Sequence, residues 1–150
     1  MSKPAEVPFE ITRLVRDSCL CLHVQRAARA LARRFDQALR PLGLTHGQFS
    51  LMMSLNRPSP PSLGAVAALL ALDRTTLTAA LKPLERRGLV ASATDPDDRR
   101  SRRLSLTPAG AALLAQATPV WSRTQAAVDG LLVEGGGDAE RLRRDLAALS

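Results

Sequence analysis

The stretch "LDRTTLTAALKPLERRGLVASATDPDDRRSRRLSLTPAG", residues 72–110, decides the fold of this chain. Asp73 is a suitable N-cap, because its carboxylate can accept the free backbone N–H groups of a first helical turn. Leu77, Leu81 and Leu84 then share one helical face, and Gly88 stands where a helix commonly ends in the left-handed conformation. The pattern predicts a short amphipathic helix that ends before Gly88.

A β-hairpin is predicted directly after this helix. "LVASAT" (89–94) and "RRLSLT" (102–107) have the composition of two short strands, with Leu104 and Leu106 on one face. The tip between them carries three acids and then four arginines, Arg99, Arg100, Arg102 and Arg103. By itself, such a tip fits an ordinary solvated turn equally well.

Another short helix is predicted just before the helix that Asp73 caps. This helix helps to interpret the arginine-rich tip. Ser62 is placed to cap "LGAVAALLA", and the tight connection to Asp73 makes the pair a candidate helix-turn-helix. A basic hairpin after such a helix is placed to reach the minor groove of DNA. The helix after Asp73 is the candidate recognition helix, and its outward face carries Arg74, Thr75, Thr78, Ala79 and Lys82.

Helical patterns continue on the N-terminal side. From 9 to 40, apolar or small residues recur at steps that fit one long amphipathic helix, which Pro41 and Gly43 end after a loose start at Pro4 and Pro8. These residues are Val15, Cys19, Leu22, Ala28, Leu31, Phe35 and Leu39. Thr45 and Gln48 have the spacing of a capping box for the next helix.

The C-terminal side is also predicted to be helical. Thr107 and Pro108 start a helix, Pro119 should kink or interrupt it, and a last helix holds Leu142, Leu146 and Leu149. The predicted fold is mainly α with a small β wing (α+β). It is one domain, 1–150, with a winged helix-turn-helix at 45–107 flanked by helices at 9–40 and 108–150.

The composition agrees with a helical, DNA-binding domain. Apolar residues make up 45% of the 150 residues, which is enough for one core, and the low aromatic content of 3% favours helices over a sheet sandwich. The formal net charge is +7, and all of the 21 basic residues except Lys3 and Lys82 are arginine. The planar arginine fork suits phosphates and base edges, so the partner is expected to be nucleic acid or another anionic surface.

Other classes of protein have little support. No apolar run approaches the roughly 18 to 20 residues that span a bilayer, and the first ten residues lack the apolar segment of a secretory signal. We therefore expect a cytoplasmic protein without membrane contact. The chain has no glycine-rich phosphate loop and no nucleophile elbow, and two His with two Cys make a zinc site unlikely to form. We expect neither an enzyme nor a cofactor.

The chain resembles the MarR family of bacterial transcriptional regulators. The residues that carry the resemblance are "ALDRTTLTAALKPLERRGLV" (71–90), "DPDDRRSRRLSLTPAG" (95–110) and, in support, "ALRPLGLTHGQFSLMMSL" (38–55). The resemblance implies a triangular homodimer, in which the helices at 9–40 and 108–150 interlock and two winged domains read a pseudo-palindromic operator in double-stranded DNA.

The resemblance also implies which residues contact DNA. The recognition helix would enter the major groove, and Asp98 would orient an inserting wing arginine, either Arg100 or its neighbour Arg99. The full candidate set is Arg74, Thr75, Thr76, Thr78, Lys82, Asp98, Arg99, Arg100 and Arg102. Ala79 and Ala80 stand where many members carry longer polar side chains, and Pro83 should bend the last turn of the helix. A sequence-independent architectural DNA-binding protein therefore remains an alternative.

The expected function is a dimeric repressor that a small lipophilic or phenolic ligand releases from DNA. One branch of the family instead senses organic hydroperoxides, and Cys21 lies 24 residues before Thr45, which matches the reactive position of that branch. Phe35 and His46 stand where that branch has two tyrosines. The alternatives are that Cys19 and Cys21 are ordinary buried helix residues, or that His23, Phe35 and His46 line a ligand pocket with Arg26 and Arg29.

Overall fold

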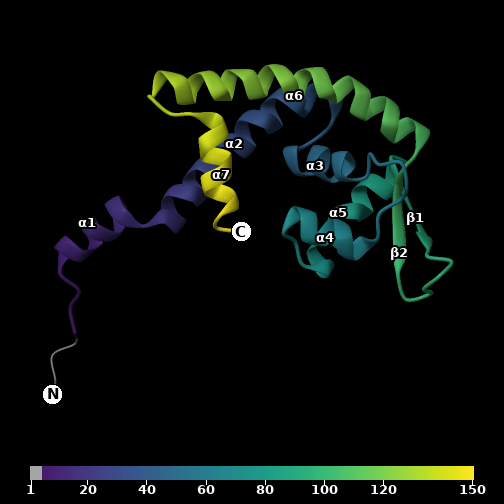
Figure 1. Ribbon diagram of the computed structural model, residues 1–150, viewed down its shortest axis with the longest axis horizontal. Coiled ribbons are helices and arrows are strands. Elements are labelled where there is room, and N and C mark those ends of the chain that lie inside the picture. The colour runs from purple at the N-terminus through teal and green to yellow at the C-terminus, as the bar shows by residue number, and fades with distance from the viewer. Residues whose placement is uncertain (1–4) are drawn as a thin grey trace. The chain divides into compact units, whose positions relative to one another are not determined.

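The computed structural model describes residues 5–150, so Pro4 lies outside the described residues (Figure 1). The chain divides into two compact units, 1–34 and 35–150. The first unit holds α1 (Phe9–Ser18) and most of α2 (Leu20–Leu39). The second begins at Phe35 and holds the remaining elements.

The helix-turn-helix and the wing form as predicted. In the second unit, α3 (His46–Ser54) and α4 (Leu63–Leu70) precede α5 (Arg74–Arg86), and a single 3-10 turn, η1 (Arg40–Leu42), leads into α3. The strands β1 (Val90–Thr94) and β2 (Arg102–Leu106) pair antiparallel, from Val90 opposite Leu106 to Thr94 opposite Arg102. Leu104 is fully buried and Leu106 half-buried, so the predicted inner face of the hairpin is confirmed.

Local caps set the starts of four helices. In each, a side-chain oxygen accepts the backbone N–H three residues on, which satisfies a donor that the helix itself leaves free. The pairs are Thr45 with Gln48, Ser62 with Ala65, Asp73 with Thr76, and Thr107 with Gly110. The capping box of Thr45 and Gln48 is complete. These four predicted starts are confirmed.

Leucine-rich faces of α3, α4 and α5 meet the base of the wing and α6 (Pro108–Glu134) in one core. The predicted stripe of Leu77, Leu81 and Leu84 is buried there. Two glycines shape the turn between α5 and the wing. Gly88 adopts φ +69°, and at Gly110 a Cβ would clash with the Leu89 carbonyl oxygen. α6 therefore begins packed directly against the backbone at the start of β1.

The single helix predicted from 9 to 40 is wrong. Cys19 adopts an extended conformation, with ψ 107°, and separates α1 from α2. Ser and Cys are weak helix formers, and no residue of α1 is buried, so tertiary packing does not hold the two helices in line. Of the seven residues on the predicted apolar stripe, Phe35 and Leu39 are the buried ones.

Of the kink or interruption predicted at Pro119, the interruption is wrong, because α6 runs through this residue without a break. Leu114 and Ala117 are buried before the proline, and Val120 and Trp121 pack against the same core after it. This packing on both sides outweighs the hydrogen bond that proline cannot donate. The helix ends at Glu134, directly before Gly135. α7 (Ala139–Ala147) follows, with Leu142 and Leu146 exposed and Leu149 just past its end.

Within residues 5–150, no individual helix combines the length and the apolar character that crossing a membrane requires. α4 and α5 meet that test of length and composition only jointly, and a bend of 103° separates them.

Candidate nucleic-acid interface

The first turn of α5 is organised by Asp73. Its carboxylate accepts the backbone N–H of Thr76 at 2.8 Å and the Thr76 hydroxyl at 2.7 Å. These two bonds hold the pKa of the Asp73 carboxyl below its usual range, the hydroxyl bond contributing most. The Thr76 hydroxyl therefore donates its hydrogen to the Asp73 carboxylate. Thr76 thus stabilises the start of α5 more than it adds a donor for DNA.

The outward face of α5 presents the other candidates. Thr75, Thr78 and Lys82 are exposed and lie at helical steps of three and four, on the side away from the buried leucines. The Thr78 hydroxyl donates to the Arg74 carbonyl at 2.8 Å. The guanidinium of Arg74 lies over Gly64 of α4, with Nη2 3.1 Å from the point where a Cβ would stand. The face is thus short, polar and cationic at both ends.

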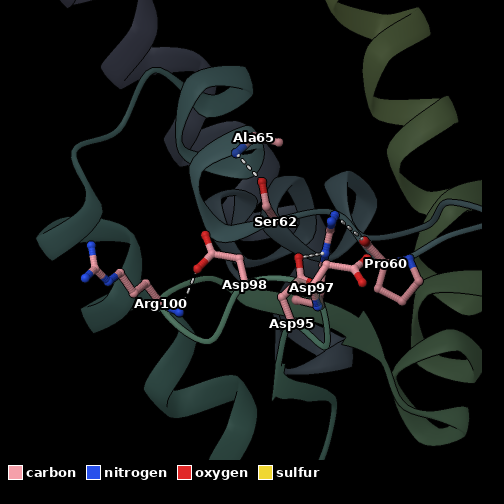
Figure 2. Close-up of polar contacts among 8 residues, drawn as sticks. Pro60, Ser62, Ala65, Asp95, Asp97, Asp98 and Arg100 are labelled. Atoms are coloured by element: carbon pink, nitrogen blue, oxygen red, sulfur yellow. Dashed lines mark hydrogen bonds and ion pairs between the residues drawn. The ribbon is translucent and has the colours of Figure 1, made fainter.

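The wing tip presents two unengaged arginines. The Asp98 carboxylate accepts the backbone N–H of Arg100 at 3.0 Å, and the Ser101 N–H donates to the Asp98 carbonyl. Asp98 therefore positions the backbone of Arg100 and not its guanidinium, which Figure 2 shows directed away from the aspartates. Within the described part of the chain, the Arg99 and Arg100 side chains have no polar partner.

The next two arginines are tied to the hairpin. Arg102 donates to the Ser92 hydroxyl at 2.6 Å, across the two strands. Arg103 pairs with Asp95 at 2.8 Å, where the two strands end and the tip begins. Asp95 and Arg103 were not among the predicted DNA-contacting residues, although both stand in the quoted stretch. Arg103 lies opposite Ala93, two residues before Asp95, so the signal was their diagonal proximity across the hairpin.

The candidate redox residues are accessible in the first unit. Cys19 and Cys21 are free thiols, half-buried and exposed respectively, so the expectation of two buried cysteines is not met within the single chain. The Gln25 amide donates to the Cys21 sulfur at 3.2 Å, and Nδ1 of the exposed His23 lies 2.8 Å from the Cys19 carbonyl oxygen.

Phe35 and His46 lie together in the second unit. Their ring centroids are 5.4 Å apart, and the Asp36 carboxylate accepts the backbone N–H of His46 at 2.7 Å. Phe35 is buried and His46 half-buried, so the phenylalanine is a core residue that the imidazole partly covers.

A cavity of about 560 Å³ opens among α3, α4, α6 and the proline-rich connector after α3. Its lining includes Phe49, Met53, Arg57, Leu69 and Trp121. The Phe49 and Trp121 rings stack with centroids 6.2 Å apart and planes inclined by 15°. None of these residues was a candidate, because the walls come from segments that are far apart in the sequence. Across residues 5–150, no group of three or more His, Cys, Asp and Glu is arranged to hold a metal ion.

Comparison with known proteins relates the chain to transcriptional regulators. The MarR family model matches residues 44–101. The chain is 28% identical to the organic hydroperoxide resistance transcriptional regulator of Bacillus subtilis, over 96% of this chain and 94% of that protein.

Two solved structures with bound DNA are similar in fold. The M. tuberculosis regulator MosR, in complex with DNA, is 39% identical with a TM-score of 0.79, over 88% of this chain and 93% of that one. The repressor CouR, bound to a 23-mer duplex, is 28% identical with a TM-score of 0.78, over 97% of this chain and 99% of that one.

Proposed function

Because this chain belongs to the MarR family of DNA-binding transcriptional regulators, we propose that it is a dimeric repressor that binds a pseudo-palindromic operator. The chain is a regulator and not an enzyme. The single observation that carries the proposal is the pairing of a polar, cationic face on α5 with two unengaged arginines at the wing tip.

The proposed contacts follow from the shape of B-DNA. α5 enters the major groove, where Thr75 and Thr78 meet base edges or thymine methyls, and Arg74 and Lys82 meet phosphates or guanine. The wing follows the backbone into the minor groove, whose negative potential attracts Arg99 or Arg100 without a base-specific bond. Asp98 supports these contacts by holding the Arg100 backbone, and Thr76 supports them through its bond to the Asp73 carboxylate. Arg102 lies beside the groove on β2.

The proposed dimer uses the helices at 9–40 and 108–150. Phe9, Ile11, Leu14 and Val15 are exposed in the first unit, and Leu131, Val133, Leu142, Leu146 and Leu149 are exposed in the second. Apolar side chains in such number favour burial against a second copy of the chain. A two-fold dimer presents two recognition helices, which explains the expected pseudo-palindrome.

The proposed signal is a small lipophilic or phenolic anion. The cavity volume of about 560 Å³ lies within the usual range of small-molecule sites, which is roughly 300 to 1,000 Å³. Stacked Phe49 and Trp121 offer an aromatic wall, and Arg57 offers a positive charge for a carboxylate or phenolate. α4 forms one wall of this cavity. A ligand bound in the cavity would therefore contact the helix that directly precedes α5.

Selection from a random duplex library tests the function. We expect the protein to recover one pseudo-palindrome and to prefer it over a shuffled duplex by about 10³-fold at physiological salt, as specific regulators do. Fluorescence anisotropy with both duplexes measures the ratio. Equal, steeply salt-dependent binding to both duplexes would replace the proposal with the architectural alternative.

A second candidate function is thiol-based sensing of organic hydroperoxides. The observation that favours it is the exposed Cys21, with the Gln25 amide 3.2 Å from its sulfur, together with the similarity to the Bacillus subtilis hydroperoxide regulator. The Cys21 thiolate would attack the peroxide oxygen, forming a sulfenic acid and releasing the alcohol. Phe35 and His46 supply no phenol hydroxyl to this thiolate.

Cysteine variants test this candidate. We expect cumene hydroperoxide to release the selected duplex from the native protein and from Cys19→Ser, but not from Cys21→Ser. Mass spectrometry of the treated protein locates the added oxygen. Release of DNA that survives in Cys21→Ser removes Cys21 from the mechanism.

A further inference from the structure

The start of the wing tip is organised by one buried carboxylate. Asp95 is only 5% exposed, although it lies between the exposed Thr94 and Pro96 at the mouth of the tip. Its carboxylate accepts the Asp97 N–H at 3.0 Å through Oδ1 and the Arg103 Nε–H at 2.8 Å through Oδ2. The Asp95 N–H donates to the Ser101 carbonyl at 2.9 Å and closes the tip. One residue thus fixes both ends of the segment that carries Arg99 and Arg100.

Arg103 extends this arrangement to the connector before α4. Its Nη1 donates to the Pro60 carbonyl at 3.3 Å (Figure 2). Next to this bond, the Leu104 N–H donates to the Pro61 carbonyl at 2.9 Å. Arg103 and Ser62 also form an isolated β-bridge, and the Ser62 hydroxyl caps α4. The wing is therefore anchored to the residues that start the helix-turn-helix.

We propose that Asp95 and Arg103 are positioning residues for DNA binding, which clamp the wing to the connector at 60–62 and so aim Arg99 and Arg100 relative to α5. The inference rests on the proposed function, because it assigns roles within the same DNA-binding surface. A wing whose tip is closed by Asp95 and whose second strand is tied to the connector presents its arginines already ordered. Less conformational freedom is then lost when DNA binds.

If only the charge of Asp95 mattered, losing it would strengthen DNA binding, whereas the clamp predicts weaker binding. This carboxylate is a negative charge in a surface that meets a polyanion, so neutralising it should strengthen binding to any duplex. The clamp predicts that neutralising it weakens binding to the specific duplex. Asp95→Asn separates the two effects, because the amide oxygen can still accept the Asp97 N–H while the charge facing Arg103 is lost.

The experiment compares Asp95→Asn, Arg103→Lys and Arg103→Gln with the native chain, by anisotropy on the selected duplex and on its shuffled counterpart. We expect Asp95→Asn to lose about tenfold on the selected duplex, the size of one charge-assisted hydrogen bond, and to bind the shuffled duplex equally or more tightly. Arg103→Lys keeps the charge but lacks the fork that reaches both Asp95 and Pro60, so it should lose most of what Arg103→Gln loses. The double variant Asp95→Asn/Arg103→Gln should lose no more than Arg103→Gln alone.

Amide exchange of the DNA-free protein gives an independent readout. In Asp95→Asn we expect faster exchange at Leu104, whose N–H meets Pro61, while the buried amides of α5 keep their native protection. Arg123→Gln, which removes an exposed charge on α6, is the control and should leave this exchange unchanged.

Two results would overturn the clamp. The first is tighter binding of Asp95→Asn to both duplexes together with native amide exchange at Leu104. The second is native affinity of Arg103→Lys for the selected duplex, which would make Arg103 a simple phosphate contact. If the native chain itself fails to prefer the selected duplex, the proposed function fails. The exchange result at Leu104 still decides whether the pair clamps the wing.

Discussion

The backbone N–H of Arg100 is bonded to Asp98, while its guanidinium is unengaged. This arrangement is expected of a side chain that binds a phosphate or a base in another molecule. We predict that Arg100→Ala weakens binding to the selected duplex by roughly tenfold to a hundredfold, because a minor-groove arginine interacts with concentrated negative potential. Anisotropy measures the affinity, and sedimentation should show an unchanged oligomeric state. Arg123→Ala loses the same charge on α6 and controls for net charge. Equal affinities for the two variants contradict the wing assignment.

Gly110 illustrates a residue whose smallness is required by packing. A Cβ there would meet the Leu89 carbonyl group, so Gly110→Ala must push α6 away from the start of β1. We predict a loss of about 1 to 3 kcal/mol in the free energy of unfolding, as for other overpacked sites. Gly130, also in α6, has nothing within 4 Å of its Cβ position. Gly130→Ala should gain roughly 0.5 to 1 kcal/mol from helix propensity. Urea unfolding at one protein concentration compares the stabilities of the two variants. If Gly110→Ala leaves the free energy of unfolding unchanged, Gly110 does not approach the Leu89 carbonyl group this closely.

At the scale of the element, α5 depends on an ionised cap. The Thr76 bonds lower the pKa of Asp73 in the folded chain, so ionisation of this carboxylate favours folding. That contribution is complete above the pKa of the unfolded chain, near 3.9, and is lost as the pH falls through the lower folded value.

We predict that Asp73→Asn is less stable than the native chain at pH 7, and that the difference shrinks as the pH approaches 3. Asparagine is a good N-cap but carries no charge to interact with the helix dipole. Urea unfolding of both proteins at pH 7, 5 and 3 measures the difference in their free energies of unfolding. The contributions of the other carboxylates cancel, because both proteins contain them. A difference that is constant over this range shows that the charge of Asp73 adds nothing.

At the scale of the whole molecule, the exposed leucines of α7 belong to the surface that the proposed dimer would bury. Leu142 and Leu146 are each 40% exposed at a helical spacing of four. We predict that Leu146→Glu raises the dissociation constant of the dimer roughly tenfold or more, because it would bury an unpaired charge. Sedimentation velocity over a dilution series measures this constant. Arg141→Gln, on the same helix and exposed, is the control; a dimer of Leu146→Glu with native affinity places the interface elsewhere.

The sequence by itself determined the features that depend on near neighbours. Helix starts at Thr45, Ser62, Asp73 and Thr107, the turn at Gly88 and the inner face of the hairpin were all predicted, because caps, glycine conformations and side-chain periodicity act within a few residues. The family followed from the same local motifs. The DNA-contacting residues remain predictions that rest on the family and on exposure.

Only the tertiary structure decided the features that need distant partners. The helical pattern runs through both Cys19 and Pro119, yet α1 breaks from α2 where nothing is buried, while α6 stays continuous where the core holds both of its halves. The cavity beside Trp121 and the link from Asp95 through Arg103 to Pro60 join segments that are remote in the chain. Local propensity cannot encode such contacts, because their energy exists only after the segments have packed together.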